Sequence, residues 1–329
     1  MRLMLAPMEG VVDVHLRKIF AAIGGIDLCV TEFIRVSQTV LPRHVFIKSC
    51  PELLTQNQSI HSTTGQHPSI PIRIQLLGSD PSLLALNAKK AARLGAIGID
   101  LNFGCPAKGV NRNRGGACLL DESPLIEEIV AAVRDAVPAS IPVSAKIRLG
   151  YNDRLSYLDN ARAIARAGAD ELIVHARSKS DGYQPPAYWH YCADIREAID
   201  IPVVANGEIW SWEDFVACKK QSHCQDFMLG RGLLAHPFLA HEIRARADGL
   251  DYHQSSQQSW LQLAPLLLDF FEHTSAAYPA RFMGNRVKQW LHYLQRHYLE
   301  AAELFKQIKR SRDYDSIYAA IKASASCSQ

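Results

Sequence analysis

Eight short runs of aliphatic and β-branched residues recur along the first 230 residues, and segments with helical periodicity separate them. The runs are 3–6, 28–32, 72–76, 98–102, 143–148, 171–175, 202–206 and 226–230. Strand-like runs that alternate with helical segments indicate βα units and a parallel sheet. Because eight such units close into a barrel of roughly 250 residues, the sequence predicts an α/β fold of the (β/α)8 TIM-barrel type.

Local signals place helices between several of these strands. Asp80 and Pro81 open a segment that runs to residue 94, and Ser123 with Pro124 open another that runs to residue 137. An Asp or Ser at the N-cap accepts backbone hydrogen bonds, and proline suits the first helical turn. Ser211 with Asp214 marks a third helix start. Residues 49–71, rich in Ser, Thr, Gln and Pro, are expected to form a long insertion between the second and third strands.

Beyond the eighth strand, no further strand-like alternation of useful length occurs. A helix is expected over 237–247, followed by a polar linker at 248–258 and by helical periodicity to about residue 322. We therefore predict two domains, a barrel over residues 1–247 and a C-terminal helical bundle domain over residues 248–329.

The overall composition excludes several classes of protein. With 48% hydrophobic and 21% charged residues the chain resembles an ordinary globular protein, and its net charge of +3 permits a polyanionic partner without requiring one. The N-terminal apolar run stops at Pro7 and Glu9, too early for a signal peptide, and no run reaches the ~18 residues of a membrane helix. Eight cysteines without a Cys-x-x-Cys pair disfavour zinc and iron–sulfur sites. We expect a cytoplasmic protein with no metal and no membrane partner.

Polar residues lie at the carboxyl ends of six predicted strands. They are Gln75; Asn102 followed by Cys105; Lys146 and Arg148; His175 and Arg177; Asn206, Gly207 and Glu208; and Gly230, Arg231 and Gly232. Taken singly, such residues are most often solvated or satisfied side chains, and a lone Cys105 is most often a small buried hydrophobe. Because barrel chemistry sits at the carboxyl ends of the strands, their occurrence at six ends predicts a functional site.

The loops after the seventh and eighth strands indicate the cofactor. In these barrels they form a phosphate site, where glycines let backbone N–H groups approach the oxygens, and Arg231 can add a charge-assisted hydrogen bond. The chain has neither a Gly-x-Gly-x-x-Gly Rossmann turn nor a Walker loop, which favours a mononucleotide, FMN, over a dinucleotide or ATP. Lys146 can then stabilise the negative edge of the reduced ring, Gln75 can hydrogen-bond it, and Pro7 and Met8 can contact its face.

A series of motifs runs through the chain in order. They are APMEG (6–10), TEF (31–33), QLLG (75–78), DLNFGCP (100–106), GGACLL (115–120), KIRLG (146–150), VHARSKSDGY (174–183), NGEI (206–209) and LGRG (229–232). This set resembles the tRNA-dihydrouridine synthases from residue 1 to about residue 235. Two later segments, RVKQWLHYL (286–294) and EAAELFKQIK (300–309), are similar to the C-type subfamily, which implies uridine 16 of the tRNA D-loop as the target.

The resemblance implies a role for each matching position. FMN is expected to lie against Pro7, Met8, Glu9, Gln75, Lys146, Asn206, Gly207, Glu208, Gly230 and Arg231, with His175 beside the ring or the phosphate. Cys105 is the implied proton donor. The implied tRNA contacts are Arg35, Asn102, Tyr183, Arg286, Lys288, Tyr293 and Lys309. Position 309 carries Lys where the family pattern has Arg, and residues 52–70 form a longer loop than the pattern has.

The reaction implied by the resemblance has two stages. NADPH reduces FMN, and the flavin then passes hydride to C6 of a uracil, so that charge develops on an enolate that takes a proton at C5. A thiol with an ordinary pKa of ~8.5 is mostly protonated at neutral pH yet releases its proton readily, which suits Cys105. A uracil stacked in tRNA must first be extruded into the pocket.

Charge in the C-terminal region favours an RNA partner. The window 281–312 holds eight Lys or Arg residues against two acids, with interleaved aromatic residues. Trp290, Leu294 and Tyr298 recur at four-residue spacing and are expected to be helix core. The polar face with Arg286, Gln289, Tyr293 and Arg296 is the candidate RNA surface, and the loop after Cys105 adds Lys108, Arg112 and Arg114.

Two other functions remain open at this point. The first is a flavoprotein similar to dihydroorotate dehydrogenase that acts on a free pyrimidine, a reading that leaves the basic helical tail unexplained. The second is a non-catalytic RNA-binding protein that has inherited the barrel. Activity on a pyrimidine without RNA would support the first, and purified protein without flavin absorbance would support the second.

Overall fold

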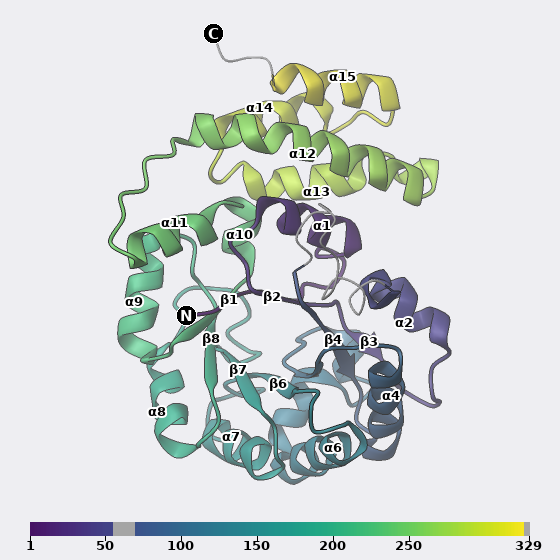
Figure 1. Ribbon diagram of the computed structural model, residues 1–329, viewed down its shortest axis with the longest axis vertical. Coiled ribbons are helices and arrows are strands. Elements are labelled where there is room, and N and C mark those ends of the chain that lie inside the picture. Colours follow the sequence, from purple (N-terminus) through teal and green to yellow (C-terminus); the bar gives the residue numbers. More distant parts are fainter. Residues whose placement is uncertain (55–69, 326–329) are drawn as a thin grey trace. The chain divides into compact units, whose positions relative to one another are not determined.

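The structure of the protein is a computed structural model that describes residues 1–54 and 70–325 (Figure 1). The chain forms two compact units. The barrel unit consists of Met1–Glu9, Ile26–Ile209 and Glu213–Gly230, and the helical unit consists of Gly10–Gly25, Trp210–Trp212 and Arg231–Gln329. Of the expected insertion at 49–71, residues 55–69 lie outside the described residues.

The barrel unit contains a closed ring of eight parallel strands. They are β1 (Leu3–Leu5), β2 (Leu28–Val30), β4 (Ile72–Leu77), β5 (Ile99–Phe103), β6 (Val143–Arg148), β7 (Glu171–His175), β8 (Val203–Asn206) and β9 (Asp226–Leu229). Neighbours pair in the order β2-β1-β9-β8-β7-β6-β5-β4, and the pairing of β2 with β4 closes the ring. The predicted (β/α)8 barrel is confirmed. Among the described residues, the two-residue strand β3 (Ile34–Arg35), which pairs with β4, was not predicted from the sequence.

Helices cover the outside of the ring. The long ones are α4 (Pro81–Arg93), α6 (Ser123–Ala136), α7 (Tyr157–Arg166), α8 (His190–Ala198) and α9 (Trp212–Ser222). Shorter elements are α2 (Arg43–Ser49), α5 (Lys108–Asn111), η1 (Pro51–Leu54) and η2 (Gly116–Asp121). Asp80 caps α4 as expected, since its carboxylate accepts from Leu83 N at 2.8 Å. Ser123 begins α6 without capping it, because its hydroxyl donates to Asn160 Oδ1 at 2.8 Å.

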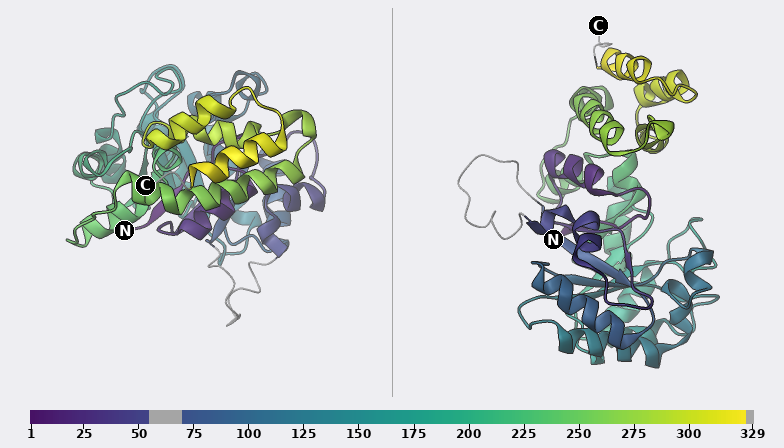
Figure 2. Two further views of the ribbon diagram at one scale, coloured as in Figure 1. Left: turned by 90° about the horizontal axis from the view of Figure 1, so that it is seen from above. Right: turned by 90° about the vertical axis from the view of Figure 1, so that its right-hand side faces the viewer.

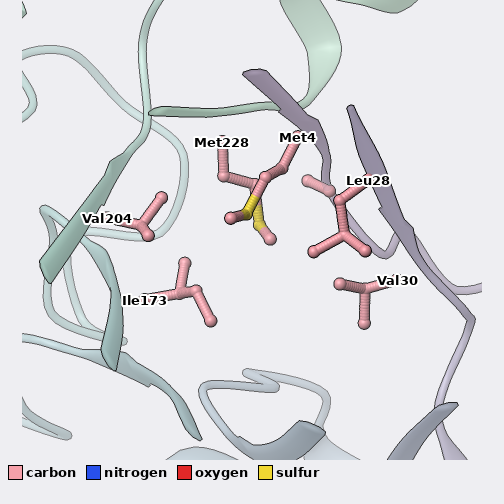
Figure 3. Close-up of a cluster of buried hydrophobic side chains, with 7 residues drawn as sticks. Met4, Leu28, Val30, Ile173, Val204 and Met228 are labelled. Atoms are coloured by element: carbon pink, nitrogen blue, oxygen red, sulfur yellow. The ribbon is translucent and has the colours of Figure 1, made fainter. Parts of the chain in front are cut away.

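The interior of the ring has an apolar layer (Figure 3). Met4, Leu28, Val30, Ile173, Val204 and Met228 point toward one another there, together with Ala6, and all are buried. Ion pairs lie at the amino ends of the strands: Arg73 meets Glu171 at 2.6 Å, and Arg2 pairs with both Glu171 and Asp226. Polar groups at this end of a barrel serve stability, which leaves the carboxyl ends for chemistry.

The helical unit contains seven α-helices within the described residues. They are α1 (Val14–Ile23), α10 (Arg231–Ala235), α11 (Leu239–Ala247), α12 (Ser256–Ala277), α13 (Asn285–Leu294), α14 (Leu299–Ile308) and α15 (Tyr314–Ser324); the short turn η3 (Ala280–Phe282) precedes α13. α12 packs against α1, α13 and α15, and α14 packs against α13 and α15 (Figure 2). The predicted C-terminal bundle is thereby confirmed, and Trp290, Leu294 and Tyr298 are buried in it as expected.

Three helices that precede the predicted domain boundary between residues 247 and 248 belong to the same compact unit as the C-terminal helices. They are α1, α10 and α11. The physical reason is packing over long sequence separations, since α1 contacts α12 and α10 contacts α13. Across residues 1–54 and 70–325, no helix combines the length and apolarity that crossing a membrane requires.

Candidate active site

Strand register places the polar carboxyl-end residues on the inner face of the ring. Lys146 pairs with Ile173, a member of the apolar interior layer, and Asn102 pairs with Lys146. Paired residues of neighbouring strands project to the same face, and so do residues two apart along one strand. Asp100 and Ser144, each two residues before one of these, therefore also face inward.

A chain of side-chain hydrogen bonds links this inner face to Cys105. Gln75 Nε2 donates to Asp100 Oδ2 at 2.7 Å, and Asn102 Nδ2 donates to Gln75 Oε1 at 2.7 Å. Asn102 Oδ1 accepts from Gly104 N at 3.0 Å and from Cys105 N at 2.9 Å. The loop that presents Cys105 is thus tied directly to Asn102 of β5 and, through Asn102, to Gln75 of β4.

The other side of the Cys105 loop is held by the end of α5 and by η2. The carbonyl oxygen of Cys105 accepts from Asn111 Nδ2 at 2.9 Å and from Ala117 N at 3.0 Å. Gly116, with a φ of 68°, lies so close that a Cβ there would meet this carbonyl oxygen at 2.7 Å. Burial raises the pKa of the partly exposed Cys105 thiol, and the charge of Glu9 raises it further. A hydrogen bond from the backbone of Ala107 and the charges of Arg148 and Arg35 oppose this rise in pKa. Cys105 is therefore a protonated thiol at neutral pH.

Lys146 is a buried cation of the inner face. Its Nζ donates to Asn206 Oδ1 at 3.0 Å, and Asn206 Nδ2 donates to Met228 O at 2.8 Å. Burial lowers the pKa of Lys146 to about 8; Arg148 lowers it further, while Asp100 opposes the shift. A buried ammonium with a lowered pKa gains from any anionic group that binds beside it.

The turns after β8 and β9 provide close backbone approach. Gly207 has a φ of 117°, and a Cβ there would lie 2.8 Å from Cδ2 of the buried His175. At Gly230 the nearest atoms that a Cβ would meet among the described residues are Ala6 Cβ at 3.7 Å and Met8 Sδ at 3.8 Å. Gly207 is thus required by its φ and by the His175 ring, whereas the backbone at Gly230 is open to the close approach that a phosphate or flavin site requires.

Arg177 binds to the turn that follows β8. Its Nη2 pairs with Glu208, which has a φ of 58°, and its Nε donates to Gln184 O at 2.7 Å. Its buried Nη1 has no hydrogen-bond partner among the residues that the structure describes. This unmatched donor, the lysine and the glycine turns form a donor set that fits an anionic cofactor.

Tyr183 is the exposed aromatic residue of the barrel mouth. Its side chain is 52% exposed, and the guanidinium of Arg148 lies 5.2 Å from its ring centroid. Arg148 is anchored in turn, donating to Gly104 O at 2.9 Å and to Gly182 O at 3.0 Å. Arg35, at the end of β3, is exposed.

Arg231 and four of the predicted tRNA contacts belong to the helical unit. Arg286 donates to Gly10 O at 2.6 Å and pairs with Asp13 at 2.8 Å, with its side chain only 15% exposed. Lys288 Nζ donates to Ser311 O, and burial, with Arg312, lowers its pKa. Tyr293 is partly exposed, whereas Lys309 is exposed. Arg286 thus already has internal partners.

The structure adds residues that the sequence reading did not assign to the site. Asp100 lies inside a strand, where a carboxylate is usually taken for a solvent-facing residue, and only the alternation of 100, 102 and 104 signals its inward position. Arg148 and Arg177 were noted at strand ends, but their carbonyl and carboxylate partners are distant in sequence. No group of three or more His, Cys, Asp or Glu in residues 1–54 and 70–325 is arranged to hold a metal ion.

A closed parallel barrel that gathers a thiol, a lysine and two glycine turns at its carboxyl ends has the architecture of a TIM-barrel enzyme. Among solved structures, the chain is similar to a variant of NCR from Zymomonas mobilis, with a TM-score of 0.51, 15% identity, and 75% of this chain and 87% of that chain covered. It is also similar to morphinone reductase, with a TM-score of 0.51, 13% identity, and 77% and 87% covered. At these identities the likeness shows the fold.

The chain belongs to the dihydrouridine synthase family, because the family model, Dihydrouridine synthase (Dus), matches residues 4–322. It is thus a flavin-dependent oxidoreductase. A protein of Aquipseudomonas alcaligenes named tRNA-dihydrouridine(16) synthase is 48% identical over 317 residues, which are 96% of this chain and 98% of that protein. A protein of the same name from Shewanella oneidensis is 46% identical over 309 residues, 94% of this chain and 93% of that one.

Proposed function

We propose that this enzyme reduces uridine to 5,6-dihydrouridine at position 16 in the D-loop of tRNA, with FMN as cofactor, NADPH as reductant and Cys105 as proton donor. The observation that carries the proposal is the partly buried, protonated thiol anchored at the carboxyl end of β5. Nearly full-length relatives that bear the name tRNA-dihydrouridine(16) synthase support the substrate and the position.

The residues of the barrel mouth suit FMN. Those that would hold it are Pro7, Met8, Glu9, Gln75, Lys146, His175, Asn206, Gly207, Glu208 and Gly230, followed in the chain by Arg231. When bound, FMN supplies the hydride that reduces the C5–C6 double bond of the uracil, after NADPH has reduced it. Lys146 places a positive charge where negative charge accumulates. The Gly207 and Gly230 turns offer backbone N–H groups to the phosphate.

Cys105 completes the reduction by acid catalysis. Its Sγ–H bond breaks as a C–H bond forms at C5 of the base, and the resulting thiolate regains a proton from solvent. Burial raises the pKa of the thiol, so the proton is present at neutral pH before each turnover. The Asn102 and Asn111 hydrogen bonds hold the loop in place, which keeps the donor at a fixed position.

Docking of tRNA needs contacts outside the pocket, because the target base must leave its stack. On the barrel side we propose Arg35, Asn102 and Tyr183, with residues 1–247 as the catalytic domain. From residues 248–329, the proposed tRNA-binding domain, we propose Arg286, Lys288, Tyr293 and Lys309. The cytoplasm, where unmodified tRNA is available, is the proposed location.

The proposal is tested on an unmodified tRNA transcript with the purified, FMN-loaded enzyme and NADPH. Mass spectrometry of nuclease fragments should show the gain of two hydrogens on the fragment that contains uridine 16. Replacing that uridine by cytidine is the matched control and should abolish the gain. Reduction of another D-loop uridine alone would refute the assigned position, and absence of any reduction would refute the activity.

A further inference from the structure

Asp100 is a buried ionisable group that the proposed reaction does not use. Asp100 lies in β5 with no exposed surface, and its carboxylate contacts neither the thiol nor the glycine turns. Oδ1 accepts from Ser144 Oγ at 2.7 Å, and Oδ2 accepts from Gln75 Nε2 at 2.7 Å. A buried carboxylate is costly, so its retention inside a barrel calls for a physical reason.

The polarity of the hydrogen-bond chain supplies that reason. A side-chain amide can turn over and exchange its oxygen with its nitrogen, so an amide alone has no fixed orientation. At one end of this chain stands a carboxylate, which only accepts, and at the other stand the Gly104 and Cys105 N–H groups, which only donate. If the amide of Gln75 or Asn102 turned over between these ends, its oxygen would face another acceptor and its NH2 group would face another donor. The ends therefore select one orientation for both amides.

The surroundings keep Asp100 an acceptor. Burial raises its pKa to about 6, while hydrogen bonds from Ser144 and Gln75 and the charges of Arg73 and Lys146 limit the rise. The carboxylate form thus predominates at neutral pH. A neutral apolar side chain in its place would leave Gln75 Nε2 without an acceptor in a fully buried position.

We propose that Asp100 is a positioning residue, which orients two successive side-chain amides and through them the backbone that presents Cys105. Its effect on catalysis rests on the proposed function of that thiol. Its effect on the position of the thiol does not, and the two are measured separately.

Three variants isolate the acceptor. Asp100→Leu removes it and keeps a side chain of similar size. Asp100→Asn retains an oxygen for Gln75, and its new amide N–H can donate to Ser144, whose hydroxyl proton can turn to Ile99 O at 3.4 Å. Ser144→Ala is the matched control, because it removes the other hydrogen bond to the same carboxylate and leaves the one to Gln75.

The first readout is the pH profile of iodoacetamide alkylation, followed by mass spectrometry on the peptide that contains Cys105. It requires neither flavin nor tRNA. Asp100→Leu should shift the profile toward that of an ordinary thiol, because a loosened loop loses the burial that raises the pKa. Asp100→Asn and Ser144→Ala should follow the wild-type profile. A well-folded Asp100→Leu protein with the wild-type profile would overturn the proposal.

The second readout is single-turnover dihydrouridine formation by FMN-loaded, NADPH-reduced enzyme. Asp100→Leu should lower this rate about tenfold to a hundredfold, the scale for a reacting group displaced by roughly 1 Å. Asp100→Asn should restore it, which a purely electrostatic role beside Lys146 would not allow. Equal loss in Asp100→Leu and Asp100→Asn would contradict the positioning role.

Reversing the chain keeps the proposal testable if Asp100→Leu does not fold. Asn102→Asp alone places two carboxylates against the Gln75 amide, so the alkylation profile should shift. In the double variant Asp100→Asn/Asn102→Asp, Gln75 can turn over and every donor again meets an acceptor, so the profile should return to wild type. If the alkylation profile of the double variant is shifted as far as that of Asn102→Asp, the inference is overturned. Normal dihydrouridine formation by Cys105→Ala would instead refute the proposed function, while the alkylation profiles still decide the positioning.

Discussion

Lys146 has a charge that depends on pH within the working range, because burial brings its pKa to about 8. Below that pH the folded protein holds a buried cation. The unfolded chain keeps its proton up to the ordinary value of 10.5, so between the two values the unfolded state binds more protons than the folded state. For the flavin-free protein, Lys146 therefore makes the free energy of unfolding rise with pH across this window.

Comparison with Lys146→Met measures this contribution. The free energy of unfolding of the flavin-free wild type, minus that of Lys146→Met, should increase as pH rises from about 8 toward 10.5. Urea titrations at several pH values give both quantities. A difference that stays constant with pH would show that the lysine is not desolvated as described.

The glycine turns predict two different outcomes. Gly207→Ala meets both a φ of 117° and His175 at 2.8 Å, so it should lose about 1–3 kcal/mol of stability together with flavin. Gly230→Ala has no atom closer than 3.7 Å, so it should keep its melting temperature and lose flavin only. Flavin absorbance and thermal unfolding separate the two losses. Full flavin content in both variants would exclude these turns as the cofactor site.

Single residues also show where sequence reasoning ends. Gln75, Asn102 and Lys146 were found because barrel chemistry sits at strand ends, and the structure gives each a partner on another strand of the ring. Asp100 was not found, because a carboxylate inside a strand is usually taken for a solvent-facing residue, and only its alternation with Asn102 signals the inward position. The ion pair between Arg286 and Asp13 could not be predicted from the sequence either, because 273 residues separate the partners.

At the level of secondary structure, strand runs were predictable to within one or two residues because each is an apolar run bounded by turns. The strand β3 escaped notice because two residues carry no periodicity. The packing partner of α1 could not be predicted from the sequence either. It follows β1 as a barrel helix does, yet it packs against α12, and such a choice between distant partners is decided by tertiary packing rather than by local sequence.

The ion pairs at the amino ends of β4 and β7 carry a stability prediction. Arg73 and Glu171 have side chains only 9% and 4% exposed, so Glu171→Ala leaves buried charge unpaired and should cost about 3–5 kcal/mol. Flavin reduction at a permissive temperature should be unchanged. The exposed pair of Arg166 with Glu127 is the matched control, and Glu127→Ala should leave the denaturant midpoint where it is. Equal effects of the two variants would contradict the structural role of the buried pair.

For the whole molecule, the arrangement of charges separates stability from RNA binding. Lys309→Ala should weaken tRNA binding and flatten the log–log salt slope by ~0.9, with no change in melting temperature, because this side chain is exposed. Arg286→Ala should chiefly lower the melting temperature, because Asp13 loses its partner. Affinities over a salt series, measured beside thermal unfolding, distinguish the two. An unchanged slope for Lys309→Ala would remove it from the docking surface.

The role of the thiol decides the proposed mechanism. Cys105→Ala, loaded with FMN and reduced by NADPH, is mixed with unmodified tRNA, and flavin reduction and dihydrouridine formation are followed as separate steps. Cys118→Ala, which removes the other partly exposed thiol among residues 1–54 and 70–325, is the control and should behave as wild type. Flavin reduction should proceed normally in Cys105→Ala, while dihydrouridine formation falls by ~10²-fold or more, the scale of a lost general acid. Dihydrouridine formation by Cys105→Ala at the wild-type rate would contradict the assignment of Cys105 as the proton donor.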